Sequence, residues 1–164
     1  MVRIGLLSDT HHFLDDAIFR HFESCDEVWH AGDFGAADLA QRLAGFRPLR
    51  GVYGNIDGQD IRAVYPEKLR WQSEGVRVLM THIGGYPPRY NPAVLRELTV
   101  DPPQLFICGH SHILKIIYDD RLRCLHMNPG AAGKQGWHLV RTVVRFTIDG
   151  PDMRDCEVIE LGKR

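Results

Sequence analysis

Five apolar segments of this chain each end in Asp, Asn or His, and for three of them a glycine comes directly before the polar residue. Short apolar runs such as these are typical of buried β-strands. In α/β sheets, ligand-binding side chains gather at the carboxyl ends of strands, so these side chains are expected to converge in the folded chain. In chain order they are Asp9 with His11, Asp33, Asn55, His82, and His110 with His112.

The order of apolar segments predicts one α/β domain with two sheets, covering residues 1–164. Strands that alternate with helices in the first third of the chain indicate parallel pairing. A hairpin, a helix that opens with Asn-Pro and a further strand fill the middle, and the last third is mostly strand. The expected strands cover residues 2–8, 27–30, 49–53, 68–72, 76–81, 104–108, 114–118, 122–126, 139–148 and 154–160, and the expected helices cover 15–24, 36–44 and 91–98.

The composition excludes several classes of protein. The formal charge is −1 with histidines neutral, so no global field draws in nucleic acid or an anionic membrane. The four cysteines form no C-x-x-C pair, which argues against a thiolate zinc site and against a disulfide framework. No apolar run approaches the ~20 residues that span a bilayer, and the run at the N-terminus is too short for a signal peptide. We therefore expect a cytoplasmic, reduced protein.

The seven donors suggest a metal centre. Carboxylate, amide and imidazole groups together suit manganese, iron, zinc or related divalent ions. One such ion needs four to six ligands, so seven donors indicate two ions that share a bridge, for which Asp33 is the candidate. Each residue alone has a structural alternative: Asp9 as a helix cap, Asn55 as a turn residue, Asp33 as a loop carboxylate and His82 as a core histidine. Their joint occurrence at five strand ends favours metal binding.

The blocks resemble, in order and spacing, those of the calcineurin-like metallophosphoesterase superfamily. They are Asp-x-His at 9–11, Gly-Asp at 32–33, Gly-Asn-x-Asp at 54–57, a solitary His82 and Gly-His-x-His at 109–112. The short chain and the Asn-Pro-Gly at 128–130 are most similar to its small YfcE-type phosphodiesterases. The resemblance implies a four-layer α/β/β/α sandwich, in which helices flank two mixed sheets and a dinuclear centre lies at the sheet edges.

The resemblance also implies how the ligands divide between two metals. One metal would take Asp9, His11, Asp33 and His112, and the other would take Asp33, Asn55, His82 and His110. Asp33 and a solvent molecule would bridge them. The implied cofactors are two divalent ions, manganese first, with iron, zinc, nickel or cobalt as alternatives.

The implied activity is hydrolysis of a phosphoester, with a bridging hydroxide that attacks phosphorus in line. A phosphodiester substrate is favoured by the resemblance alone. A phosphomonoesterase or nucleotidase on the same centre is an alternative. A scaffold that binds a partner is another, because the retromer subunit of this fold is similar and serves mainly in that way.

One position departs from the superfamily pattern. Many members have histidine after the asparagine of Gly-Asn-x-Asp and use it near the leaving group, whereas this chain has Ile56. A general acid typically supplies ~10²–10⁴-fold, so the chain either uses another acid or prefers good leaving groups. His12 is a candidate acid, with an exposed loop residue as the alternative.

Two further residues complete the predicted site, and Asn55 has a second role in it. Asn55 is expected to serve in catalysis as well as in metal binding. Asp57 is also predicted to serve in catalysis: it could hold a ligand, a metal-bound solvent molecule or a backbone group, with a plain turn cap as the alternative. Arg89, in a loop that follows His82, is predicted to meet a substrate phosphate.

The predicted partner is a small phosphoester. The absence of a basic stripe argues against long duplex nucleic acid, and no membrane contact is expected. Self-association is left open, because apolar residues of the last strands could face a second copy or their own core.

Overall fold

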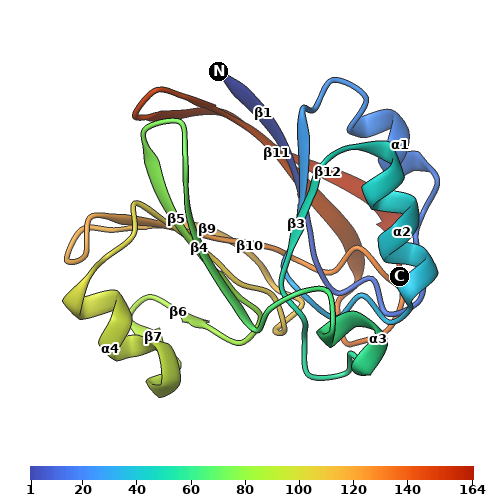
Figure 1. Cartoon of the computed structure of the whole chain (residues 1–164), viewed down its shortest axis with the longest axis horizontal. Coiled ribbons are helices and arrows are strands. Elements are labelled where there is room, and N and C mark those ends of the chain that lie inside the picture. Colours follow the sequence, from blue (N-terminus) through green and yellow to red (C-terminus); the bar gives the residue numbers. More distant parts are fainter.

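The computed structural model describes residues 1–164 as four layers, with two five-stranded sheets packed face to face and helices on their outer sides (Figure 1). The fold class expected above is thus confirmed. No helix is long and apolar enough to cross a bilayer. The helices are α1 (Ala17–His21), α2 (Ala37–Phe46), α3 (Gln59–Arg62) and α4 (Pro92–Val100). The strands are β1 (Val2–Leu7), β2 (Glu27–His30), β3 (Leu49–Gly51), β4 (Lys68–Ser73), β5 (Val76–Thr81), β6 (Gly85–Tyr86), β7 (Arg89–Tyr90), β8 (Leu105–Ile107), β9 (Leu114–Asp119), β10 (Cys124–Pro129), β11 (Val140–Asp149) and β12 (Asp152–Lys163).

The first sheet has the strand order β12-β11-β1-β2-β3. Strands β1, β2 and β3 run parallel, and their registers pair Leu7 with His30 and His30 with Gly51. β11 and β12 extend the sheet with antiparallel pairing. The carboxyl ends of the three parallel strands therefore lie side by side at one edge of the sheet.

The second sheet has the order β4-β5-β8-β10-β9. Its three central strands are parallel, with Met80 opposite Ile107 and Ile107 opposite Met127. The antiparallel strands β4 and β9 form its two edges. This sheet contributes the ends of β5 and β8, which lead into His82 and into the loop that carries His110 and His112.

The main core lies between the two sheets. Fourteen buried residues form one cluster there, including Ile4 and Trp29 of the first sheet and Val78 and Leu105 of the second. Trp29 packs edge-on against Trp71, with ring centroids 4.9 Å apart. Burial of apolar side chains from both sheets in one cluster fixes the position of one sheet on the other.

Two outer cores attach the helices. α1 and α2 cover the first sheet through Ile18 and Leu43, and α4 covers the second through Val94 and Leu98. α4 begins as the sequence predicts, because the Asn91 side chain accepts a hydrogen bond from the Ala93 backbone N–H at 2.9 Å and proline follows at the first helical position.

Several observed elements differ from the expected ones. β3 ends at Gly51 rather than at residue 53, β10 covers Cys124–Pro129 rather than 122–126, and β12 covers Asp152–Lys163 rather than 154–160. α1 covers only Ala17–His21 of the expected 15–24, because residues 22–24 form turns. The four-residue helix α3 was not predicted, and it buries a single apolar side chain, Ile61. The small β6–β7 hairpin was also not predicted, since Pro87 and Pro88 occupy its turn and proline is not typical of strands.

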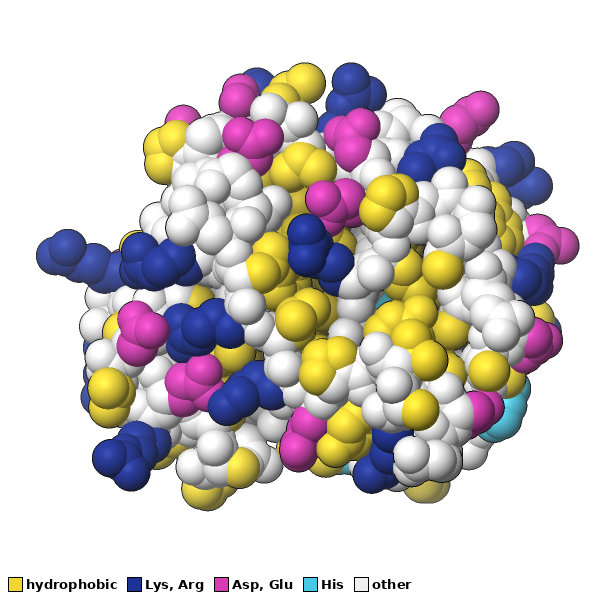
Figure 2. Space-filling view, viewed as in Figure 1, with side chains coloured by type: hydrophobic (Ala, Val, Ile, Leu, Met, Phe, Trp, Pro, Cys, Tyr) yellow, Lys and Arg dark blue, Asp and Glu magenta, His cyan; other side chains and the backbone are white.

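Basic and acidic side chains are interspersed over the face shown in Figure 2, as expected from a near-neutral composition. Hydrophobic side chains gather near the middle of this face, where the two sheets meet in Figure 1.

Candidate metal centre

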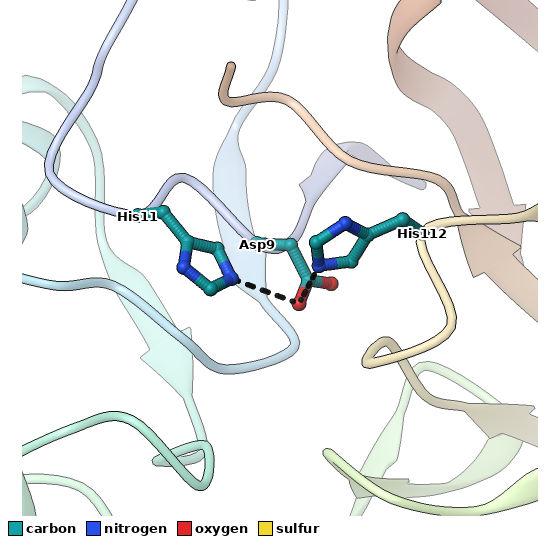
Figure 3. A group of neighbouring side chains, drawn as sticks. All are labelled: Asp9, His11 and His112. Atoms are coloured by element: carbon teal, nitrogen blue, oxygen red, sulfur yellow. Dashed lines mark ion pairs between the residues drawn. The ribbon is translucent and has the colours of Figure 1, made fainter. Parts of the chain in front are cut away.

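The structure brings six of the seven predicted metal-binding residues into two adjoining groups. Asp9, His11 and His112 form the first (Figure 3), and the second contains one carboxylate and two imidazoles. Within each group, the candidate ligand atoms all lie within 4.8 Å of one another. The second group is Asp33, His82 and His110.

The first group is arranged around one oxygen of Asp9. His112 Nε2 lies 3.1 Å from Asp9 Oδ1, and His11 Nε2 lies 3.7 Å from the same oxygen. His11 Nε2 is also 3.3 Å from Asp33 Oδ2, which belongs to the second group. The two groups therefore share a boundary at His11, and the carboxylates of Asp9 and Asp33 face the same imidazole.

The second group is arranged around one oxygen of Asp33. His82 Nε2 lies 3.1 Å from Asp33 Oδ2 and 3.8 Å from Asp9 Oδ1. The seventh predicted ligand joins through His110, whose Nδ1 lies 3.0 Å from Asn55 Oδ1. All seven residues are thus connected by short contacts, although they come from five separate strand ends of two sheets.

The backbone at the donors is unusual. Asp9, His11, Asp33, His110 and His112 all have positive φ, between 44° and 71°. This left-handed region costs about 1–3 kcal/mol for a residue that is not glycine, and such residues cluster at functional sites. The surrounding fold therefore holds these five residues in positions that the local sequence alone does not favour.

Two glycines allow the loops to approach the donors closely. A Cβ on Gly54 would lie 2.0 Å from Asp33 Oδ1, and a Cβ on Gly109 would lie 2.7 Å from Asp9 Oδ2. Any side chain at either position would collide with a carboxylate. The glycines in Gly-Asn and Gly-His are therefore needed for space.

Each carboxylate has one oxygen fixed by the protein and the other directed at the histidines. Ser8 Oγ donates to Asp9 Oδ2 at 2.6 Å, and the His110 backbone N–H donates to the same oxygen at 3.1 Å. The Ile56 backbone N–H donates to Asp33 Oδ1 at 3.0 Å. Oδ1 of Asp9 and Oδ2 of Asp33 remain to face the imidazoles.

His82 is oriented in the same way. Its Nδ1 lies 2.7 Å from the Ala31 carbonyl oxygen, so Nδ1 donates and Nε2 carries a lone pair towards the carboxylates when the ring is neutral. A histidine that ligates metal typically donates its other ring N–H to a carbonyl or carboxylate in this manner.

Three buried polar atoms of the centre make no hydrogen bond, namely Asp9 Oδ1, His11 Nε2 and His82 Nε2. Buried polar atoms are normally hydrogen-bonded, so three such atoms facing one another need a shared partner. Oxygen and imidazole nitrogen together are the donors that borderline divalent ions prefer. The residues present therefore fit divalent cations.

Electrostatics at the centre couple the carboxylates to the histidines. The nearby carboxylates of Asp33 and Asp9 raise the pKa of His11 to about 9. Burial opposes ionisation of Asp9 and Asp33, but the neighbouring imidazoles of His11, His82 and His112 outweigh it and lower the pKa of both carboxyl groups. A divalent ion that binds the same atoms competes with the histidine protons.

Asp57 lies beside the centre, and backbone groups occupy its carboxylate. Oδ1 accepts from the Gly35 N–H at 2.9 Å, and Oδ2 accepts from the N–H groups of Gly54 at 2.8 Å and Phe34 at 3.2 Å. These contacts join the loop after β2 to the loop after β3. Of the roles considered from the sequence, they favour holding backbone groups, so Asp57 is a positioning residue in this arrangement.

The structure does not bring His12 and Arg89 to the donor cluster. His12 is exposed, with a φ of 68°, and belongs to neither donor group. Arg89 is exposed in the β6–β7 hairpin and lines neither of the two hollows that adjoin the donors. The roles predicted for these two residues remain predictions without a contact to support them.

Buried neighbours brace the loops that carry the donors. His30 stacks on Phe34 with ring centroids 3.7 Å apart, and its Nδ1 accepts the Gly32 N–H at 3.1 Å. Burial lowers the pKa of His30 to about 3, so the ring is neutral. The Asn128 amide donates to the Gly109 carbonyl at 3.0 Å and to Ser111 Oγ at 3.1 Å. The Asn-Pro-Gly segment thus supports the Gly-His-x-His loop.

Two hollows meet at the donors. A shallow recess of about 270 Å³ is lined by five of the donors and, on its rim, by residues that include Ile56 and Trp137. A larger cavity of about 540 Å³ reaches the donors at Asn55 and His82 and is lined further by Arg62 and other side chains. Asn55 lines both hollows.

Sequence reasoning missed Trp137 and Arg62. The signal available for Trp137 is a large aromatic residue within the otherwise small and polar stretch Gly-Lys-Gln-Gly-Trp. No comparable signal marks Arg62, which lies in the helix α3 that the sequence did not predict.

A family model matches residues 2–150, which is most of the chain, and is described as the calcineurin-like phosphoesterase superfamily domain. The chain belongs to this superfamily. Membership confirms the resemblance found in the sequence and implies divalent metal ions at the site. It also supports metal-dependent hydrolysis of a phosphoester.

This calcineurin-like phosphoesterase is 29% identical to a probable metallophosphoesterase of Methanothermobacter thermautotrophicus, over 97% of this chain and 92% of the relative. It is similar to the solved structure of an archaeal phosphodiesterase, with a TM-score of 0.75 and 21% identity over 97% of this chain and 99% of the other. It is also similar to zinc-complexed Vps29 of Entamoeba histolytica, with a TM-score of 0.73 and 14% identity over 96% and 98% of the two chains. At these identities the two structures support the fold alone.

Proposed function

We propose that this calcineurin-like phosphoesterase is a phosphodiesterase with a dinuclear metal centre. The observation that carries the proposal is the connected set of seven donors, in which two groups adjoin at His11 and Asp33. Seven donors exceed what one divalent ion needs. One ion would be held by Asp9, His11, Asp33 and His112, and the other by Asp33, Asn55, His82 and His110.

When bound, two such ions supply Lewis acidity at the phosphoryl oxygens and lower the pKa of bound water from 15.7 towards ~7. The residues of the chain provide the positions. Ser8 and the His110 N–H fix one oxygen of Asp9, and the Ile56 N–H fixes one oxygen of Asp33, so the other oxygen of each carboxylate would be free to hold an ion. Side chains held in this way need little rearrangement as charge develops, which favours the transition state.

A diester is supported by the two hollows that meet at Asn55. A phosphodiester carries two organic substituents, and each hollow can accept one while the phosphate lies at the donors. A phosphomonoester would leave one of the hollows without an occupant. The similar archaeal structure is that of a phosphodiesterase, which also supports this choice.

Ile56 restricts the chemistry of the leaving group. It lies between Asn55 and Asp57 in the sequence, lines the recess and offers no proton, and His12 does not line that recess. The position after Asn55 therefore supplies no general acid. We expect substrates whose leaving group departs without protonation.

The proposal is tested by removing metal from the purified protein and restoring Mn²⁺. Metal-restored protein should bind two equivalents of manganese and hydrolyse bis(p-nitrophenyl) phosphate faster than p-nitrophenyl phosphate. Asp33→Asn should lose both properties, whereas Asp38→Asn, an exposed aspartate in the first turn of α2, should keep them. Preference for the monoester would favour a phosphatase or nucleotidase.

A scaffold that binds a partner is the second candidate, because Vps29 shares the fold. The complete donor set favours catalysis over this alternative. Hydrolysis of neither substrate with manganese, iron, zinc, nickel or cobalt would support the scaffold. A small phosphoester as substrate, a cytoplasmic location and self-association remain predictions from the sequence.

A further inference from the structure

Trp137 stands almost entirely in solvent beside the donors. Its side chain is 97% exposed, whereas Trp29 is buried and Trp71 is half-buried in the core between the sheets. Trp137 nevertheless lines the recess that contains His11 and His112. A large aromatic ring left in water next to a polar centre is available to a ligand that binds there.

The loop that carries Trp137 is attached at both sides of this residue. The Gly136 backbone lies against His112, since a Cβ at Gly136 would be 2.1 Å from His112 Nδ1. The Gly136 carbonyl accepts a hydrogen bond from the Arg164 guanidinium. On the other side, His138 Nε2 lies 2.8 Å from the Gly133 carbonyl oxygen. These contacts fix the backbone around the exposed indole.

Ile56 gives the same recess a second apolar residue. Its side chain is 42% exposed and lines the recess together with Trp137. Its backbone N–H donates to Asp33 Oδ1 at 3.0 Å, so its position is fixed relative to the donors. The rim thus offers an aromatic ring and an aliphatic side chain next to the place where a phosphate would bind.

We propose that Trp137 and Ile56 bind a flat aromatic substituent of the phosphodiester, such as a nucleobase or an aryl ring, while the second substituent lies in the cavity beyond Asn55. This inference rests on the proposed function and names its substrate class. Aromatic rings stack on exposed indoles irrespective of their hydrogen-bonding pattern, so the subsite accepts different bases.

The matched probes are adenosine 5′-monophosphate and ribose 5-phosphate, which share the phosphate and sugar and differ in the flat base. With manganese-loaded protein, the nucleotide should inhibit hydrolysis of bis(p-nitrophenyl) phosphate about 5- to 150-fold more strongly than ribose 5-phosphate. Trp137→Ala should remove this difference and leave inhibition by ribose 5-phosphate unchanged. Leu139→Ala is the control, because Leu139 is 81% exposed in the same loop but does not line the recess.

Tryptophan fluorescence gives a second measurement that needs no turnover. The nucleotide should quench the wild-type protein and not Trp137→Ala, since the two remaining tryptophans lie in the core. Equal binding of the two probes by wild-type protein would refute the inference. So would a Trp137→Ala variant that weakens both probes alike, or one that only changes the oligomeric state. Absence of hydrolysis with base-dependent quenching intact would instead count against the proposed function alone.

Discussion

Replacing Asp57 with alanine tests whether one buried carboxylate holds two loops of the centre in place. Asp57 is 3% exposed, and its oxygens accept three backbone N–H groups, at 2.8 Å from Gly54, 2.9 Å from Gly35 and 3.2 Å from Phe34. Asp33 lies in the first of the two loops and Asn55 in the second. The alanine variant would leave the three N–H groups without their acceptor.

The cost follows from these contacts. A hydrogen bond to a charged group contributes ~1.5–3 kcal/mol, so simple addition over three bonds gives ~4.5–9 kcal/mol. Water can enter the space left by the carboxylate and satisfy part of the loss, so we expect the free energy of unfolding to fall by about 4 kcal/mol. For a domain of this size that change lowers Tm by roughly 8–16 °C. The manganese affinity should also fall, by about 10- to 100-fold.

Urea denaturation of the metal-free protein isolates the first effect, and calorimetric titration with Mn²⁺ measures the second. Asp60→Asn is the control, because Asp60 is exposed three residues away and should shift the stability by no more than ~0.5 kcal/mol. A loss of less than 1 kcal/mol in Asp57→Ala would show that the three bonds do not hold the loops. Weakened metal binding with normal stability would instead indicate a direct role at the ions.

Three further predictions concern the donors and their surroundings. Gly136→Ala should push His112 aside and weaken manganese binding about 10- to 100-fold, whereas Gly45→Ala, in open space on α2, should be neutral or slightly stabilising in urea denaturation. Ile56→His should speed hydrolysis of diesters with poor leaving groups up to ~10²-fold and flatten a plot of rate against leaving-group pKa; an unchanged slope would contradict this. Because the pKa of His11 is about 9, binding of manganese at pH 7 should release protons, and the affinity should rise with pH until about pH 9. Titration in two buffers of different ionisation enthalpy counts these protons, and a flat pH dependence would count against the assignment of His11.

The strand ends could be predicted because their physical signal is local. An apolar run followed by Asp, Asn or His places a donor at the end of a strand, independently of the rest of the chain. Parallel pairing of β1 with β2, β2 with β3 and β5 with β8 then sets these strand ends side by side in each sheet. The start of α4 at Asn-Pro could also be predicted, because the Asn91 side chain caps the helix that follows it directly.

The remainder depends on contacts between distant segments. The three N–H groups that Asp57 accepts come from two loops, and only the folded backbone aligns them. Trp137 reaches the recess because the Arg164 guanidinium holds the Gly136 carbonyl, a contact across 28 residues that no local pattern reveals. His12 was a candidate acid because it is adjacent to His11 in the sequence, but its side chain is exposed and belongs to neither donor group.

The donors come from both sheets. Asp9, His11, Asp33 and Asn55 follow strands of the first sheet, and His82, His110 and His112 follow strands of the second. Ions held by this set would link the two sheets, so a shift or separation of the sheets would release them. Retention of metal therefore reports how firmly the two sheets are packed together. Chelation should first weaken the contact between the sheets, which would be visible as faster amide hydrogen exchange in β1 and β8, before the chain as a whole unfolds.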